Sequence, residues 1–153
     1  MGKIRYFFVV FLIVLLGIAG CSNVPNEPPN EPPNISVKIK NQTIEVSKGG
    51  YRWETKGLFS NSSVIADTAS PMQIAESLIA QPVEKNSIAI CKFSDSSKPT
   101  ISANLWEEEN QTKTLQVKDS KITLPSEKGR HIIEIYAEWK NGNASYTFVV
   151  DVK

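Results

Sequence analysis

The sequence predicts a mainly β domain, an antiparallel sandwich with one short helix, which follows a targeting segment and a Pro-rich linker. Residues 35–153 contain short runs in which apolar and polar residues alternate, and these runs are separated by Asn, Asp, Ser, Gly and Lys turns. Alternation with a period of two is typical of half-buried strands. Asn141-Gly142 lies between the last two runs, and Asn-Gly in that position is the strongest short-range signal for a hairpin.

The first part of the chain has the order of a secretory signal. Lys3 and Arg5 form a positive start, and residues 6–16 follow without a charge. The apolar run ends at Ile18-Ala19-Gly20-Cys21, which resembles the lipobox of bacterial lipoprotein signal peptides. The resemblance implies that Ile18, Ala19 and Gly20 are recognised by a lipoprotein signal peptidase. It also implies that Cys21 is the residue that carries the lipid, a palmitate-type diacylglycerol.

Two alternatives for this segment remain open. An uncleaved transmembrane helix over residues 4–18 would need about 20 apolar residues to cross a bilayer, and a plain secretory signal would lack the lipid. All three interpretations place the remainder outside the cytoplasm. We therefore expect a signal peptide over 1–20, a lipidated Cys and tether over 21–34, and a domain over 35–153.

The tether is Pro-rich and contains an immediate repeat. Asn26-Glu27-Pro28-Pro29 is followed by Asn30-Glu31-Pro32-Pro33, and five of the nine prolines fall within residues 22–34. Proline fixes φ and removes a donor, so the stretch favours polyproline II at about 3.1 Å per residue. We expect a spacer that holds the domain away from the membrane.

The expected elements follow from alternation and from turn residues. After the first strand, Asn41-Gln42 forms a turn, Gly49-Gly50 ends a strand, and residues 60–63 form a Ser/Asn-rich loop. The expected strands cover residues 35–40, 43–46, 51–54, 87–93, 101–107, 113–118, 122–124, 132–139 and 144–152. Short strands at such spacing predict an antiparallel sandwich.

One helix is expected after residue 70. Ser70 is its predicted N-cap, Pro71 occupies the first helical position, and Gln73 completes a capping box. Pro82 is expected to end the segment. An apolar helix face is expected from Met72, Ala75, Leu78 and Ile79.

The C-terminal third resembles the closing strands of bacterial immunoglobulin-like domains. The matching residues are Leu124-Pro125, Gly129, the strand over 132–139, Asn141-Gly142 and residues 145–150. More weakly, residues 35–153 are similar to small lipoproteins of Gram-positive bacteria that have no assigned activity. The chain has His131 where such domains often have a Tyr that bonds the backbone at a strand corner. A neutral imidazole is expected to make a similar bond and to lose it on protonation.

Charge argues against a nucleic-acid partner. Lys3 and Arg5 lie in the signal segment, so 15 basic and all 16 acidic residues remain in residues 21–153. Binding dominated by phosphate contacts needs a basic surface, and the overall balance does not indicate one. We expect a monomer.

No catalytic set, metal site or cofactor is expected. His131 is the single histidine, and a His-based mechanism would have to use it with a nucleophile and a carboxylate. Cys91 alternates with Ala89 and Phe93, which predicts a buried and unreactive thiol. The run Glu107-Glu108-Glu109 lacks the Gly and alternating Asp/Asn of calcium loops, and a solvated loop is favoured over a calcium site.

The tryptophans are the best candidates for contact with a partner. Trp139 is in phase with Ile133 and Ile135, which predicts core packing. Trp106 has the opposite phase from Leu105, so either partner binding or a structural role is open. Trp53 with Tyr51 is comparable, and these three aromatic residues form the candidate partner-binding set.

The expected function is a lipid-anchored, non-enzymatic interaction module on the extracytoplasmic face of the cell membrane, contacting a protein or a cell-envelope component. Two alternatives remain open. One is a small cell-envelope hydrolase that uses His131 or paired carboxylates. The other is a lipoprotein that carries a small ligand beneath the helix over 71–80.

Overall fold

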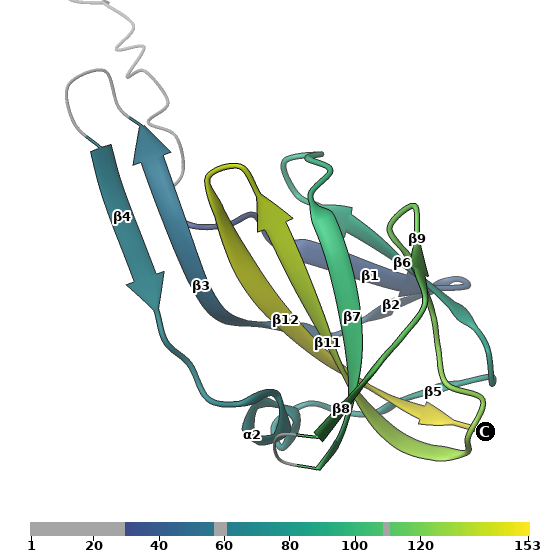
Figure 1. Cartoon of the computed structure of the whole chain (residues 1–153). Coiled ribbons are helices and arrows are strands. Elements are labelled where there is room, and N and C mark those ends of the chain that lie inside the picture. The colour runs from purple at the N-terminus through teal and green to yellow at the C-terminus, as the bar shows by residue number, and fades with distance from the viewer. Residues whose placement is uncertain (1–29, 57–60, 109–110) are drawn as a thin grey trace, which may run out of the picture.

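The structure is a computed structural model that describes residues 30–56, 61–108 and 111–153. The predicted lipobox, Cys21 and the first part of the tether lie outside these residues. The described chain forms two antiparallel sheets that pack face to face, with one short helix against the outer face of the larger sheet (Figure 1). The predicted β-sandwich is therefore confirmed.

The smaller sheet has five strands in the order β2-β1-β6-β10-β9. Their bounds are Gln42–Ile44 for β2, Ile35–Ile39 for β1, Ile88–Phe93 for β6, Lys121–Thr123 for β10 and Val117–Lys118 for β9. Asp119 and Ser120 both have positive φ, at 51° and 58°. This is the type I′ geometry that joins two strands by a two-residue turn, here β9 and β10.

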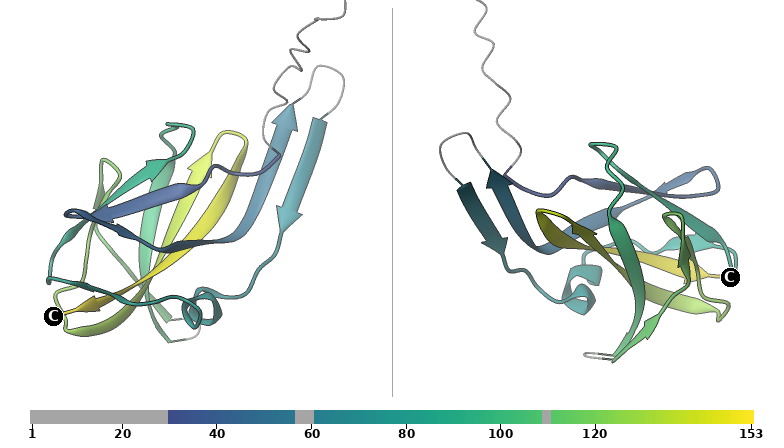
Figure 2. Two further views of the ribbon diagram at one scale, coloured as in Figure 1. Left: turned by 180° about the vertical axis from the view of Figure 1, so that it is seen from behind. Right: turned by 45° about the horizontal axis from the view of Figure 1, so that its top comes forward.

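The larger sheet has the order β4-β3-β12-β11-β7-β8, and β5 adds to β12 as a parallel strand. Their bounds are Asn61–Ala66 for β4, Val46–Lys56 for β3, Gly142–Val152 for β12, Gly129–Trp139 for β11, Thr100–Glu108 for β7, Gln111–Thr114 for β8 and Gln81–Val83 for β5. The two views in Figure 2 show this sheet lying across the smaller one.

The strand order is that of an immunoglobulin-like sandwich. Strands β1, β6, β10 and β9 correspond to the A, B, E and D strands of one sheet, and β7, β11 and β12 correspond to C, F and G of the other. The chain departs from that strand order between the A and B strands, where it inserts β2, β3, β4, α2 and β5. Strands β3 and β4 extend the larger sheet beyond β12, and Figure 1 shows this hairpin projecting from the rest.

The core lies between the sheets and is formed by the inward residues of alternating strands. The largest fully buried side chains there are Tyr146, Phe148, Ile122, Leu124, Ile133 and Ile135. The final hairpin contributes most of them, as its alternation predicts. β11 and β12 pair in register from Gly129↔Val152 to Trp139↔Gly142, which confirms the predicted hairpin. Its two turn residues are Lys140 and Asn141, because Gly142 already belongs to β12.

Two predicted interruptions are wrong. Gly49-Gly50 does not end a strand, because β3 runs through it and shifts register against β12 between Ala144 and Tyr146. A Cβ at Gly49 would collide with the Ser145 hydroxyl, so glycine permits the close approach at this bulge. Residues 61–63 were expected in a loop but begin β4, because pairing with β3 overrides their low strand propensity.

The predicted helix start is confirmed, and its length is not. The Ser70 hydroxyl accepts from the Gln73 amide at 3.4 Å, and the Gln73 side chain accepts from the Ser70 amide at 3.0 Å. Helix α2 covers only Pro71–Ala75. Ile79, predicted on the buried helix face, is 70 % exposed because helical periodicity does not continue that far.

Two other element predictions need correction. Residues 113–118 form two strands, β8 and β9, that belong to different sheets. Pro82, predicted only as a stop, lies in β5, where an edge position tolerates the missing donor.

Candidate functional site

The outer face of the smaller sheet carries lysines in a row across the strands. Lys38 of β1 pairs with Ile90 of β6, Ile90 pairs with Lys121 of β10, and Lys121 pairs with Lys118 of β9. All three lysines are exposed, and the residues beside them in sequence point into the core. We call this surface the basic face; it comprises Ser36, Lys38, Thr43, Ile88, Ile90, Lys92, Lys118, Lys121 and Thr123.

Two isoleucines lie among these lysines. Ile88 and Ile90 are 42 % and 38 % exposed, whereas Ala89, Cys91 and Phe93 on the opposite side of the same strand are buried. Branched aliphatic side chains left in water are not required by the fold, because the strand already buries its inward residues. The basic face therefore combines apolar and cationic groups on one flat surface.

The basic face is hollowed at two places. A hollow of about 480 Å³ lies against Ile90 and Lys92 and the loop residues Ser96 to Lys98. A second, of about 360 Å³, lies against Ile88, Gln116 and Lys121. Both include Asp119 at the β9–β10 turn, the one acid among their lining residues. Hydroxyl donors and ammonium groups thus surround shallow, open depressions.

The charge of the basic face is segregated from that of the rest of the domain. The five strands of the smaller sheet contain Lys38, Lys92, Lys118 and Lys121, and no Asp or Glu. Among the ion pairs of the described residues, none involves these four lysines. Like charges directly opposite one another in a sheet are destabilising, as in the Lys118–Lys121 pair. The arrangement suits an anionic surface.

Of the aromatic residues predicted to contact a partner, the structure buries Trp53 and partly buries Tyr51 and Trp106. Trp53 is 5 % exposed and packs edge-on against Trp139, with ring centroids 5.3 Å apart. Trp139 also contacts the Phe93 ring and donates from Nε1 to the Ser97 hydroxyl at 2.8 Å, so its predicted core role is confirmed. Tyr51 is partly buried against the same core. We therefore assign Trp53 and Tyr51 to packing.

Trp106 packs beneath the helix instead of facing solvent. It belongs to a second apolar cluster with Ile132, Val149 and Ala75, on the outer face of the larger sheet. Its Nε1 donates to a Glu134 carboxylate oxygen at 2.9 Å. Of the two interpretations left open by the sequence, the geometry favours the structural one.

His131 contacts the backbone at the predicted corner. Its Nε2 lies 2.7 Å from the Glu127 carbonyl oxygen. A carbonyl can only accept, so Nε2 is the donor, and both a neutral tautomer and the imidazolium supply that hydrogen. The expected corner bond is thus present, and the expectation that protonation would break it is wrong.

Cys91 is 5 % exposed on the inward side of β6, as predicted. Burial raises the pKa of its thiol to about 12, which removes the thiolate at neutral pH. Across the described ranges, no group of three His, Cys, Asp or Glu side chains is placed to hold a metal ion. Glu107 is exposed, while Glu109 and Asn110 lie outside the described residues.

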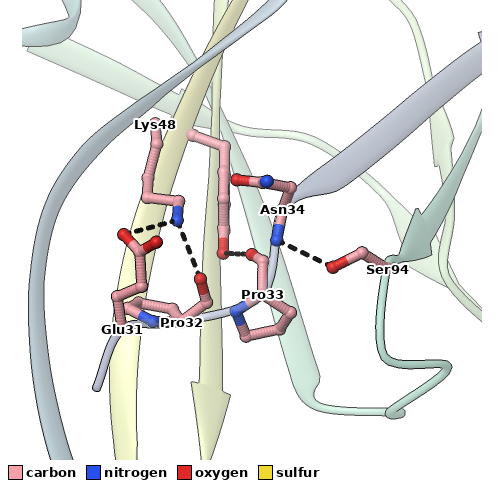
Figure 3. Close-up of polar contacts among 7 residues, drawn as sticks. Glu31, Pro32, Pro33, Asn34, Lys48 and Ser94 are labelled. Carbon is pink, nitrogen blue, oxygen red and sulfur yellow. Dashed lines mark hydrogen bonds and ion pairs between the residues drawn. The ribbon is translucent and has the colours of Figure 1, made fainter. Parts of the chain in front are cut away.

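The last residues of the predicted tether are bound to the domain. Figure 3 shows Lys48 donating to the Pro32 carbonyl oxygen at 2.8 Å, and the same ammonium lies 3.4 Å from Glu31. Pro32 is fully buried, and the Tyr146 hydroxyl donates to the Pro33 carbonyl oxygen at 2.6 Å. Burial raises the pKa of Tyr146, and the carboxylates of Asp95 and Glu31 raise it further.

A second pair of bonds fixes the chain where β1 begins. The Asn34 amide donates to the Ser94 hydroxyl at 3.1 Å, and the Ser94 amide donates to the Asn34 carbonyl at 2.8 Å. The predicted boundary at residue 35 therefore lies directly after a docked segment over residues 31–34 that is also bound to the domain. The tether meets the domain beside the first strand of the smaller sheet.

Sequence patterns alone do not single out Lys38, Ile90, Lys118 or Lys121. A signal was present in β6, where Ile88 and Ile90 alternate with Ala89 and Cys91. Lys92 shares the side of β6 with Ile88 and Ile90 and marks that side as exposed, so the two isoleucines there are more apolar than an exposed side requires. The lysines come from four separate strands, and only their register brings them together.

No protein-family model matches the chain, and no curated protein or solved structure matches it. The class of protein is thus defined by the fold and the candidate site alone. Within the part of the chain that the structure describes, no helix is long and apolar enough to cross a membrane.

Proposed function

We propose that the chain is a lipid-anchored, non-enzymatic interaction module that acts at the extracytoplasmic face of the membrane and contacts a cell-envelope component through its basic face. The observation that carries this proposal is the row Lys38, Ile90, Lys121 and Lys118 in register across four strands. The lipobox over 18–21 supports the anchor. Such a surface can bind an anionic component by charge and apolar contact, with no catalytic group required.

The docked residues of the tether keep the domain close to the proposed lipid anchor. Pro32 and the bonds from Lys48 and Tyr146 tie the chain to the domain from Glu31 onward. The residues between Cys21 and this docked segment number about nine, and would reach roughly 28 Å as polyproline II. A domain held this close to its anchor meets envelope components at high effective concentration.

The anchor is tested by fractionation of cells that express Cys21→Ser. We expect the wild-type chain in the membrane fraction as an acylated species and the variant as an unacylated precursor. An acylated, normally processed Cys21→Ser chain would refute the anchor.

The contact surface is tested by crosslinking in the same cells. Lys38→Glu/Lys118→Glu/Lys121→Glu is expected to lose crosslinked envelope components. The matched variant Lys56→Glu/Lys113→Glu/Lys128→Glu has the same net charge with its changes elsewhere, and is expected to retain them. Equal crosslinking by both variants would remove the basic face from consideration.

The non-enzymatic character is tested at His131. We expect His131→Ala and the wild-type chain to be equally inactive toward generic ester, peptide and glycan substrates. Turnover that depends on His131 would favour the hydrolase alternative.

A further inference from the structure

We infer that the partner of the basic face is the anionic phospholipid surface of the membrane to which the chain is anchored, so that the domain lies with its smaller sheet against the bilayer. This inference rests on the proposed function, because the anchor supplies the proximity. It adds the chemical class of the partner and the orientation of the domain.

The composition of the basic face favours a bilayer over a purely ionic ligand. Lys38 and Lys121 flank Ile90, and Lys118 lies beyond Lys121. Ile88 lies one row away, next to Thr123. Basic and apolar groups on one face are the signature of segments that lie in the headgroup region, where lysines meet phosphates and aliphatic groups reach the acyl boundary. A soluble phosphate polymer would use the lysines and leave two exposed isoleucines without a role.

The opposite side of the molecule is unsuited to this contact. The outer face of the larger sheet carries Glu134 and Glu138 on β11 together with Arg130, which is bonded to the Ala75 carbonyl, and α2 covers part of this face. Its exposed hairpin strand β4 contains no lysine or arginine. The domain is therefore asymmetric, with one surface that attracts anionic headgroups and one that does not.

The position of the tether agrees with this orientation. The docked segment ends at Asn34, and β1 follows directly, with Lys38 four residues further on. At about 3.3 Å per residue, roughly 13 Å separate the end of the tether from the row of lysines. The docked residues bond to Lys48 of β3 and Tyr146 of β12 and then lead directly into β1, so the anchored end of the chain enters the domain close in sequence to the row of lysines.

The test uses the full lipidated chain in vesicles and a reporter on the basic face. Ile90→Cys introduces an exposed thiol for a polarity-sensitive dye, because Cys91 is buried and Cys21 is expected to carry the lipid. The matched position is Ile65→Cys, at a 60 % exposed isoleucine on β4 of the larger sheet. Vesicles contain phosphatidylcholine alone or with about 30 % phosphatidylglycerol.

We expect the dye at position 90 to report an apolar environment in the anionic vesicles only, and the dye at position 65 to report water in both. Salt at about 0.5 M should abolish the signal, because screening shortens the range of surface attraction. Lys38→Glu/Lys118→Glu/Lys121→Glu should lower the membrane-facing population about 100-fold, at roughly fivefold for each lysine lost. Lys56→Glu/Lys113→Glu/Lys128→Glu should retain it.

Flotation separates the failure of this inference from the failure of the anchor. A chain that floats with vesicles but gives no signal at position 90, or gives the same signal in neutral vesicles, overturns the membrane as partner and leaves the anchor intact. A signal produced by soluble polyphosphate and not by anionic vesicles identifies a polymer as the partner, and also overturns it. A chain that does not float lacks the anchor, and the proposed function fails with the inference.

Discussion

The two sheets of this domain differ in what covers their outer faces. The larger sheet covers part of its outer face with α2, and Ala75, Ile132 and Val149 form a second apolar cluster there. Arg130 ties that helix down by donating to the Ala75 carbonyl at 2.6 Å. The smaller sheet leaves its outer face bare, with four lysines and two exposed isoleucines. Apolar residues on a sheet's outer face thus pack beneath a helix in one case, and in the other they stay exposed on the surface that we propose as the contact site.

The largest expected effect compares the two sides of β6. Cys91 has a pKa raised to about 12 by burial, so its thiolate fraction at pH 8 is about 1000-fold below that of an ordinary thiol. The exposed thiol of Ile90→Cys, one residue away, should react with a thiol reagent at least that much faster in the folded protein. The labelling rates of the two thiols are measured with and without denaturant. Rapid labelling of native Cys91 would contradict the assignment of the faces.

The same thiol predicts a loss of stability at alkaline pH. The folded-state pKa lies above the ordinary value of 9, so the unfolded chain releases this proton first. Stability that is complete below pH 9 should fall as pH rises toward 12, by up to roughly 1.4 kcal/mol per pH unit from this group. In denaturant titrations, the free energy of unfolding of Cys91→Ala should depend less steeply on pH between pH 9 and 12.

The covered and bare faces should respond differently to the same substitution. Ile132→Thr removes a methyl group and places a hydroxyl beneath α2, where the side chain is 6 % exposed, and should cost about 2–3 kcal/mol. Ile90→Thr keeps a β-branched residue on the bare face and should cost less than about 0.5 kcal/mol. Urea unfolding of both variants checks the difference. Equal losses would mean that the basic face is also a packed surface.

A substitution at Trp106 tests whether this side chain belongs to the covered face or contacts a partner. Trp106→Phe loses the bond from Nε1 to Glu134 and part of the packing under the helix, and should lower the free energy of unfolding by about 1–2 kcal/mol. Glu134→Gln keeps an acceptor and should cost less. Crosslinked envelope components should be unchanged by Trp106→Phe. A changed set with unaltered stability would restore Trp106 as a partner contact.

The smallest expected effect is a gain in stability. Lys121→Glu places a carboxylate opposite Lys118 and beside Ile90, and should stabilise the fold by about 0.2–1 kcal/mol at low salt. The same change should weaken membrane contact. Thermal unfolding at low and high salt measures the gain, which screening should reduce. A loss of stability would show that the lysine row has a structural role.

Local patterns predicted the parts of the fold that depend on neighbours in sequence. The capping box at Ser70 and Gln73, the final hairpin and the inward phase of Cys91 all follow from spacing and side-chain chemistry. The length of α2, the continuation of β3 through Gly49-Gly50 and the strand over Asn61–Ala66 could not be predicted in this way. Each depends on a partner strand or on a contact far away in the chain.

By itself, the sequence determined a β-sandwich with one short capped helix, because strand alternation, turn residues and caps act over a few residues. Only the tertiary structure decided that Trp53 is buried, that Glu31 to Asn34 are docked, and that Lys38, Lys118 and Lys121 share a row with Ile90. The physical reason is register. Which side chains lie side by side across a sheet is fixed by backbone pairing between distant strands, and no local pattern encodes it.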